Sequence, residues 1–157
     1  MSSSVAGVMD FSAVGLVYPG AGRVLVSLGK ILVPVDGSPY AKKALECAVT
    51  QAKMSGSSIT IMYAAHSHIA PLARSLEDHG KRILEEAKGT GQAAGIDTNT
   101  FLVYGPPADE ILNKAETGKY DMIVIGSRGR TAAKSFLLGS VSDKVSHHAK
   151  CPVLIVK

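Results

Sequence analysis

The sequence is poor in residues that several protein classes need. Two cysteines, Cys47 and Cys151, lie far apart without a CxxC pair, which excludes a disulfide framework and a zinc ribbon. Five tyrosines, three phenylalanines and no tryptophan are too few to form a stacking platform for single-stranded nucleic acid. The densest basic cluster, Arg128, Arg130 and Lys134, is too sparse for a nucleic-acid footprint. We therefore expect no nucleic-acid partner.

Charge and hydropathy are those of an ordinary globular domain. Of the 157 residues, 46% are hydrophobic and 19% are charged, which rules out wholesale disorder and provides for one sizeable core. The formal net charge is +4, a mild excess that suits a phosphate-bearing ligand without requiring one. Two cysteines without a disulfide framework fit a reducing compartment, so we expect a cytoplasmic protein.

Residues 1–29 differ in composition from the rest of the chain. They are rich in Ser, Gly, Ala and Val, and carry only two charged side chains, Asp10 and Arg23. No basic segment precedes their apolar part, which argues against a secretory signal, and glycines with Asp10 interrupt it, which argues against a membrane span. We expect no membrane partner. The prediction is an N-terminal extension, a hairpin around residues 19–22 or poorly ordered, followed by one domain over residues 30–157.

From residue 30 onward, short apolar runs alternate with segments of helical periodicity. Strands are predicted over 31–35, 58–65, 98–104, 122–125 and 151–156, and helices over 39–55, 71–94, 107–117 and 140–149. Strict alternation with β-branched runs indicates an α/β fold in which helices cover both faces of a parallel sheet. Such sheets bind ligands beyond the carboxyl ends of strands, where the strand order reverses. If the first and fourth strands are neighbours, Asp36 and Gly126 meet at that point.

A glycine-containing loop follows the fourth strand and carries the clearest chemistry. Gly126 and Gly129 permit close backbone approach, and Gly139 opens a helix whose N–H groups and dipole suit an anion. Further donors and positive charge come from nearby side chains: Ser140, Ser142, Arg128, Arg130 and Lys134. A tight strand–helix turn would explain the same glycines, and Arg128 and Arg130 would then be solvated loop charges. Neither GxxxxGK(S/T) nor GxGxxG after the first strand occurs, which excludes a P-loop NTPase and the dinucleotide fingerprint.

Two distant motifs resemble one known family. Residues 30–38, KILVPVDGS, are similar to the opening of universal stress proteins. Residues 126–140 match the nucleotide signature of that family, G-x2-G-x9-G-(S/T), without a gap, and residues 140–156 resemble its closing segment. The resemblance covers about residues 30–157, whereas residues 1–29 have no counterpart in the family pattern.

The resemblance implies a five-stranded parallel sheet of order 3-2-1-4-5 and, because the signature is intact, an ATP binder. Pro34 and Asp36 would flank the adenosine, the backbone of Ala64 would meet the adenine edge, and Gly126 would lie under the ribose. A Mg or Mn ion would bridge the phosphate oxygens, without protein side chains as metal ligands. The predicted nucleotide-binding residues are Pro34, Val35, Asp36, Ala64, Gly126, Ser127, Arg128, Gly129, Arg130, Gly139, Ser140, Val141 and Ser142. From the residues alone, Asp36 can also be a turn or helix-cap carboxylate.

Family members usually dimerise, which implies a homodimer through the last strand, Val153 to Val156. Between Gly126 and Ser142 the loop contains no Asp, Glu, His or Gln to orient a water, so we expect no catalytic residues and little or no ATP hydrolysis. The main hypothesis is an ATP-binding regulatory protein with an unidentified protein partner. Two alternatives stay open: a nucleotide-independent dimeric interaction module on the same fold, and an enzyme of adenylate chemistry, for which no acceptor site is marked.

Overall fold

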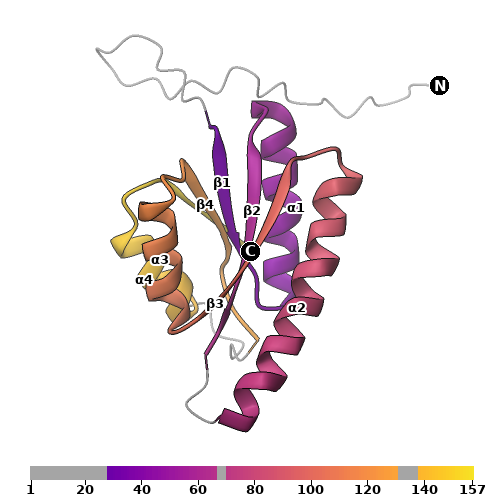
Figure 1. Ribbon diagram of the computed structural model, residues 1–157. Coiled ribbons are helices and arrows are strands. Elements are labelled where there is room, and N and C mark those ends of the chain that lie inside the picture. The colour runs from indigo at the N-terminus through magenta and orange to yellow at the C-terminus, as the bar shows by residue number, and fades with distance from the viewer. Residues whose placement is uncertain (1–27, 67–69, 131–137) are drawn as a thin grey trace, which may run out of the picture.

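The computed structural model describes residues 28–66, 70–130 and 138–157 (Figure 1). The predicted extension over residues 1–29 therefore lies, up to residue 27, outside the described residues, as does Lys134 of the glycine loop. Strands and helices alternate as predicted. In chain order they are β1 (Lys30–Pro34), α1 (Pro39–Ser55), β2 (Ser58–Ala65), α2 (Ala70–Ala93), β3 (Thr98–Tyr104), α3 (Pro107–Thr117), β4 (Met122–Gly126), α4 (Ser140–His148) and β5 (Val153–Val156).

All strands are parallel and follow the order β3-β2-β1-β4-β5, which confirms the predicted fold. The central strand β1 is an apolar run with neighbours on both sides, and Ile31 pairs with Ile59 of β2 and with Met122 of β4. Because the chain moves outward to β3 and then returns to β4, the strand order reverses at β1. This is the topological position at which sheets of this kind bind ligands.

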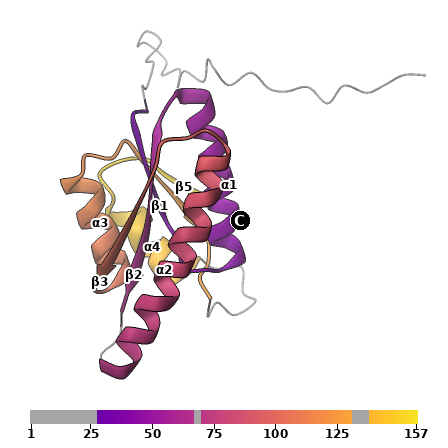
Figure 2. The same ribbon diagram turned by 45° about the vertical axis from the view of Figure 1, so that its right-hand side comes forward.

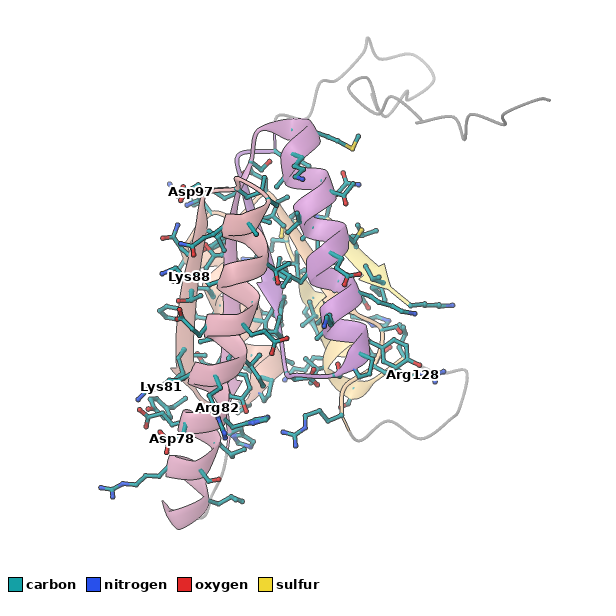
Figure 3. All side chains as sticks on the ribbon, turned by 90° about the vertical axis from the view of Figure 1, so that its right-hand side faces the viewer. Asp78, Lys81, Arg82, Lys88, Asp97 and Arg128 are labelled. Carbon is teal, nitrogen blue, oxygen red and sulfur yellow. The ribbon has the colours of Figure 1, made fainter. Side chains whose placement is uncertain are left out.

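Two helices cover each face of the sheet. Helices α1 and α2 pack on one side and α3 and α4 on the other, which Figures 1 and 2 both show, and Figure 3 looks onto the side that α1 and α2 cover. Alternate residues of β1 supply the two cores, since Ile31 and Val33 face α1 and α2 while Leu32 faces α3 and α4. All three side chains are fully buried. The sheet is thus a rigid platform whose carboxyl edge holds the connecting loops.

Strand boundaries differ slightly from the prediction. Strand β1 ends at Pro34, although the Val35 N–H still donates to the Met62 carbonyl at 2.8 Å. Strand β5 begins at Val153 rather than at Cys151, because Pro152 has no N–H for a ladder, although its carbonyl accepts from the Ile123 N–H at 3.0 Å. None of the described helices combines the length and the apolar character needed to cross a bilayer.

Candidate nucleotide site

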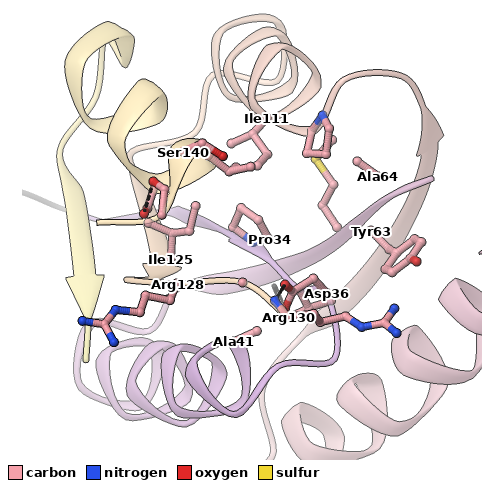
Figure 4. A pocket seen from close by; sticks show the side chains of 18 of the residues that line it. Pro34, Asp36, Ala41, Tyr63, Ala64, Ile111, Ile125, Arg128, Arg130 and Ser140 are labelled. Carbon is pink, nitrogen blue, oxygen red and sulfur yellow. Dashed lines mark hydrogen bonds between the residues drawn. The ribbon is translucent and has the colours of Figure 1, made fainter. Parts of the chain in front are cut away.

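A cavity of about 730 Å³ lies beyond the carboxyl ends of β1 and β4 (Figure 4). The structure brings together every predicted site residue except Ser127 in its lining, namely Pro34, Val35, Asp36, Ala64, Gly126, Arg128, Gly129, Arg130, Gly139, Ser140, Val141 and Ser142. These residues come from three separate parts of the sequence, 34–36, 64 and 126–142, which the pairing of β1 with β2 and with β4 brings together. The cavity therefore sits at the reversal of strand order.

The turn from β1 into α1 places Asp36 at the cavity. Gly37 adopts a φ of 82°, a left-handed backbone conformation that favours glycine, and a Cβ there would also lie 2.8 Å from Ile83 Cδ1. Ser38 then caps α1, its hydroxyl oxygen accepting from the Ala41 N–H at 3.1 Å. Asp36 Oδ1 accepts from the Ser38 N–H at 2.9 Å. Asp36 thus has the turn role that the sequence left open, and it also lines the cavity.

The second carboxylate oxygen of Asp36 holds the loop after β4. Asp36 Oδ2 accepts from the Arg130 N–H at 3.1 Å, across 94 positions of sequence. The preceding residue is Gly129, and a Cβ at that position would lie 2.9 Å from the same oxygen. Glycine therefore lets the loop backbone settle on the carboxylate, which fixes the entrance of the loop against the end of β1.

Helix α4 begins at the cavity wall. Its N-cap residue, Gly139, offers no side-chain oxygen, so no side chain caps the first N–H groups of the helix. Gly139 and the next three residues line the cavity. Ser142 Oγ lies 2.9 Å from the carbonyl oxygens of Ser127 and Gly139, which ties its hydroxyl to the loop backbone. The positive end of the helix dipole and its uncapped N–H groups can therefore receive an anion.

Ser127 lies beneath the loop and outside the cavity lining. It is buried, its N–H donates to Val156 O at 2.7 Å, and its carbonyl accepts from the Gly139 N–H at 2.8 Å. These bonds join the end of β5, the loop and the start of α4. The structure thus gives Ser127 a framework position.

Both loop arginines direct their guanidinium groups toward neighbouring elements (Figure 4). Arg128 Cζ lies 5.9 Å from the centroid of the Tyr40 ring on α1. Arg130 Nη1 lies 3.2 Å from His79 Nε2 on α2. Both residues line the cavity, and their charged groups make contacts that the sequence pattern does not reveal.

The opposite walls of the cavity come from residues that no motif marks. They are Ala41, Met62, Tyr63, His66, Leu76, Pro107, Ile111 and Ile125, contributed by α1, β2 and the residue after it, α2, α3 and β4. Burial raises the pKa of Tyr63, the positive charge of Arg130 opposes this rise, and the Asp36 carboxylate adds to it. The only sequence signal for these residues is position, because several of them end β2 or begin α3, at the same edge of the sheet as Asp36.

The site offers few ligands for a metal ion. Asp36 is the one carboxylate in the described lining, and no group of three or more His, Cys, Asp or Glu side chains that could hold an ion occurs in residues 28–66, 70–130 and 138–157. The donor set of the cavity is therefore dominated by backbone N–H groups and hydroxyls, which bind anions.

Known proteins resemble both the sequence and the fold. The model of the Universal stress protein family matches residues 28–157. Universal stress protein YxiE of Bacillus subtilis (strain 168) is 39% identical over 145 residues, which cover 82% of this chain and 98% of YxiE. The universal stress protein UspA from Lactobacillus plantarum shares the fold with a TM-score of 0.80, at 24% identity over 85% of this chain and 100% of UspA. A universal stress protein solved in complex with cAMP is 30% identical, with a TM-score of 0.70, over 83% of this chain and 98% of that protein.

Proposed function

We propose that this chain, which belongs to the universal stress protein family, binds an adenine nucleotide in the cavity at the ends of β1 and β4. The observation that carries the proposal is the start of α4, where N–H groups without a side-chain cap meet a cavity of about 730 Å³. A phosphate there would satisfy those donors and the helix dipole. The relative solved with cAMP supports a nucleotide as the carrier of that phosphate.

The remaining walls suit a nucleoside. Met62, Pro107 and Ile111 offer apolar surface to a base, beside the end of β2 at Ala64. Each carboxylate oxygen of Asp36 accepts one backbone N–H and retains a lone pair, which a ribose hydroxyl can use as acceptor. We assign the base to the Ala64 side, the ribose to Asp36 and Gly126, and the phosphates to Gly129, Gly139, Ser140 and Val141.

We further propose ATP as the ligand, with a Mg or Mn ion bridging its phosphates. The single carboxylate in the described lining fits an ion that enters with the triphosphate, its oxygens supplying most of the ligands. Residues 126–142 contain no carboxylate, histidine or glutamine that would orient an attacking water. We therefore expect phosphate release far slower than about 1 s⁻¹, the low end of ordinary enzyme turnover.

The biological role proposed is regulatory. Residues 30–157 would form the nucleotide-binding domain of a cytoplasmic protein, and Cys47 and Cys151, free thiols in the structure, support a reducing compartment. Strand β5 is an edge strand of half-buried apolar residues, which supports a homodimer through Val153 to Val156. Nucleotide occupancy would then alter contacts with an unidentified protein partner.

Calorimetry of the full chain with ATP and magnesium tests the proposal. We expect saturable heat and a rise in Tm, since a ligand at about 100 times its Kd stabilises a protein by about 2.7 kcal/mol. Gly129→Ala should weaken ATP binding, because its Cβ would meet Asp36 Oδ2 at 2.9 Å. Gly89→Ala is the matched control, since nothing lies within 4 Å of a Cβ there. Absence of both heat and Tm shift in the wild type would favour the nucleotide-independent interaction module.

A further inference from the structure

Arg130 joins three elements at the rim of the cavity. Its backbone N–H donates to Asp36 Oδ2 at the end of β1, and its guanidinium Nη1 lies 3.2 Å from His79 Nε2 on α2. Figure 4 shows Arg130 beside Asp36, with its side chain extending away from Ser140. Helix α2 lies outside the glycine signature, so the contact with His79 adds an element to the site that the signature does not contain.

The hydrogen bond between Arg130 and His79 has only one possible donor, the guanidinium. A guanidinium only donates, so the contact requires His79 Nε2 as acceptor and therefore the tautomer with its hydrogen on Nδ1. The ring is itself held in place, edge-on to Tyr63 with the ring centroids 6.4 Å apart and an interplanar angle of 79°. A Cβ on Gly37 would lie 3.8 Å from His79 Nε2, which shows how closely the turn after β1 approaches the ring. His79 is therefore a fixed acceptor.

Arg130 is held at its backbone N–H by Asp36 and at its guanidinium by His79, and both contacts restrain the preceding residue, Gly129. Gly129 rests against Asp36, where a Cβ would be 2.9 Å from Oδ2, and it lines the cavity together with Arg130. Release of the guanidinium would leave Arg130 with its backbone hydrogen bond to Asp36 at 3.1 Å. Ser38 Oγ would still donate to Arg128 O at 3.5 Å. The backbone at Gly129 is thus restrained from the end of β1 and, through the Arg130 side chain, from α2.

We propose that His79 is a positioning residue, which holds Arg130 so that residues 127–130, directly after β4, keep the shape that receives the phosphate chain. This inference rests on the proposed function and adds to it a determinant of preference for nucleotides with longer phosphate chains. His79 acts through Arg130 and the backbone beside it. Its contribution to the binding free energy therefore grows with the number of phosphates and vanishes for the nucleoside.

The test is a phosphate series. Dissociation constants for adenosine, AMP, ADP and ATP, each with magnesium, are measured by calorimetry on full-length wild type, His79→Phe and His79→Gln. Phenylalanine keeps a ring against Tyr63 and removes the acceptor, whereas the glutamine carbonyl restores an acceptor near the place of Nε2. His148→Phe, at the exposed end of α4, is the matched control.

We expect His79→Phe to bind adenosine like wild type and ATP about three- to tenfold more weakly, which is the net contribution of an ordinary hydrogen bond that water partly replaces. His79→Gln should recover most of the loss, and His148→Phe should match wild type. Equal losses for adenosine and ATP, unchanged or tighter ATP binding by His79→Phe, or no recovery with glutamine would each overturn the positioning role. Absence of binding in wild type would overturn the proposed function and the inference together.

Discussion

Alanine at Gly126 places one methyl group against the backbone of the first helix. The Cβ would lie 2.7 Å from the carbonyl carbon of Tyr40, and 2.9 Å from both Ala41 N and Tyr40 Cβ. Two of these atoms are backbone atoms in the first turn of α1, which Ser38 caps and where Ala41 is buried. Neither side can move easily, because Gly126 also pairs with Val156 of β5.

The expected loss of stability follows from how short these contacts are. Overpacking a well-packed interior costs about 1–3 kcal/mol, and a contact with helix backbone belongs at the upper end of that range. A chain of this size loses roughly 3–4 °C of Tm per kcal/mol, so we expect Gly126→Ala to melt roughly 6–12 °C below wild type. Nucleotide binding should weaken as well, because any shift of α1 or β4 displaces residues that line the cavity.

Thermal unfolding followed by circular dichroism measures this difference without ligand. Gly89→Ala is the control, an exposed helical position with nothing within 4 Å of the added Cβ, where alanine should stabilise the protein by about 0.5–1 kcal/mol. The two variants make the same chemical change, so opposite signs isolate the contact with α1. A Tm for Gly126→Ala at or above that of wild type would refute the reasoning.

Three further predictions concern single side chains. Ser142→Ala removes the hydroxyl between Ser127 O and Gly139 O, so the free energy of unfolding in urea should fall by about 1–2 kcal/mol and ATP should bind more weakly. An unchanged urea midpoint would contradict this. Asp121→Ala removes the oxygen that accepts from the Gly29 and Lys30 N–H groups at 2.9 and 2.8 Å and should cost about 1 kcal/mol in the same assay, whereas Asp121→Asn keeps an acceptor and should cost less. Burial raises the pKa of both thiols, so at pH 8 Cys47 and Cys151 should react with a disulfide reagent more slowly in the folded protein than in urea; equal rates would show that the thiols are exposed.

The sequence predicted the order of elements well because most strands contain an apolar run and the segments between them place apolar side chains at helical spacing. Ser38 and Gly56 mark both ends of α1: Ser38 accepts from the Ala41 N–H, and Gly56 ends the helix in the left-handed region with a φ of 71°. Periodicity could not supply the strand order, since it carries no information on which strands are neighbours. That order came from the resemblance to a family, and the register of β1 with β2 and β4 confirms it.

The site was predictable where the chemistry needs a particular residue type at a fixed spacing. The glycines and Ser140 of the loop satisfy that condition, and so does Asp36 at the end of an apolar strand. The walls formed by Met62 and Ile111 satisfy no such condition, because any apolar side chain of suitable size would serve. His79 is harder still, since its contact with Arg130 depends on how α2 packs over the sheet rather than on any local pattern.

Two of the three signature glycines, Gly126 and Gly129, avoid a clash between two parts of this chain, and Gly139 avoids a tight contact. A Cβ would meet α1 at Gly126, the Asp36 carboxylate at Gly129 and the Arg128 backbone, at 3.3 Å, at Gly139. The signature glycines thus let the two described ends of the loop, 126–130 and 138–140, pack against their own scaffold. A chain that binds no ligand but needs the same packing of the loop would keep the same spacing of glycines. Ligand binding therefore has to be judged from the uncapped helix end and the open cavity beside it, which calorimetry with ATP addresses directly.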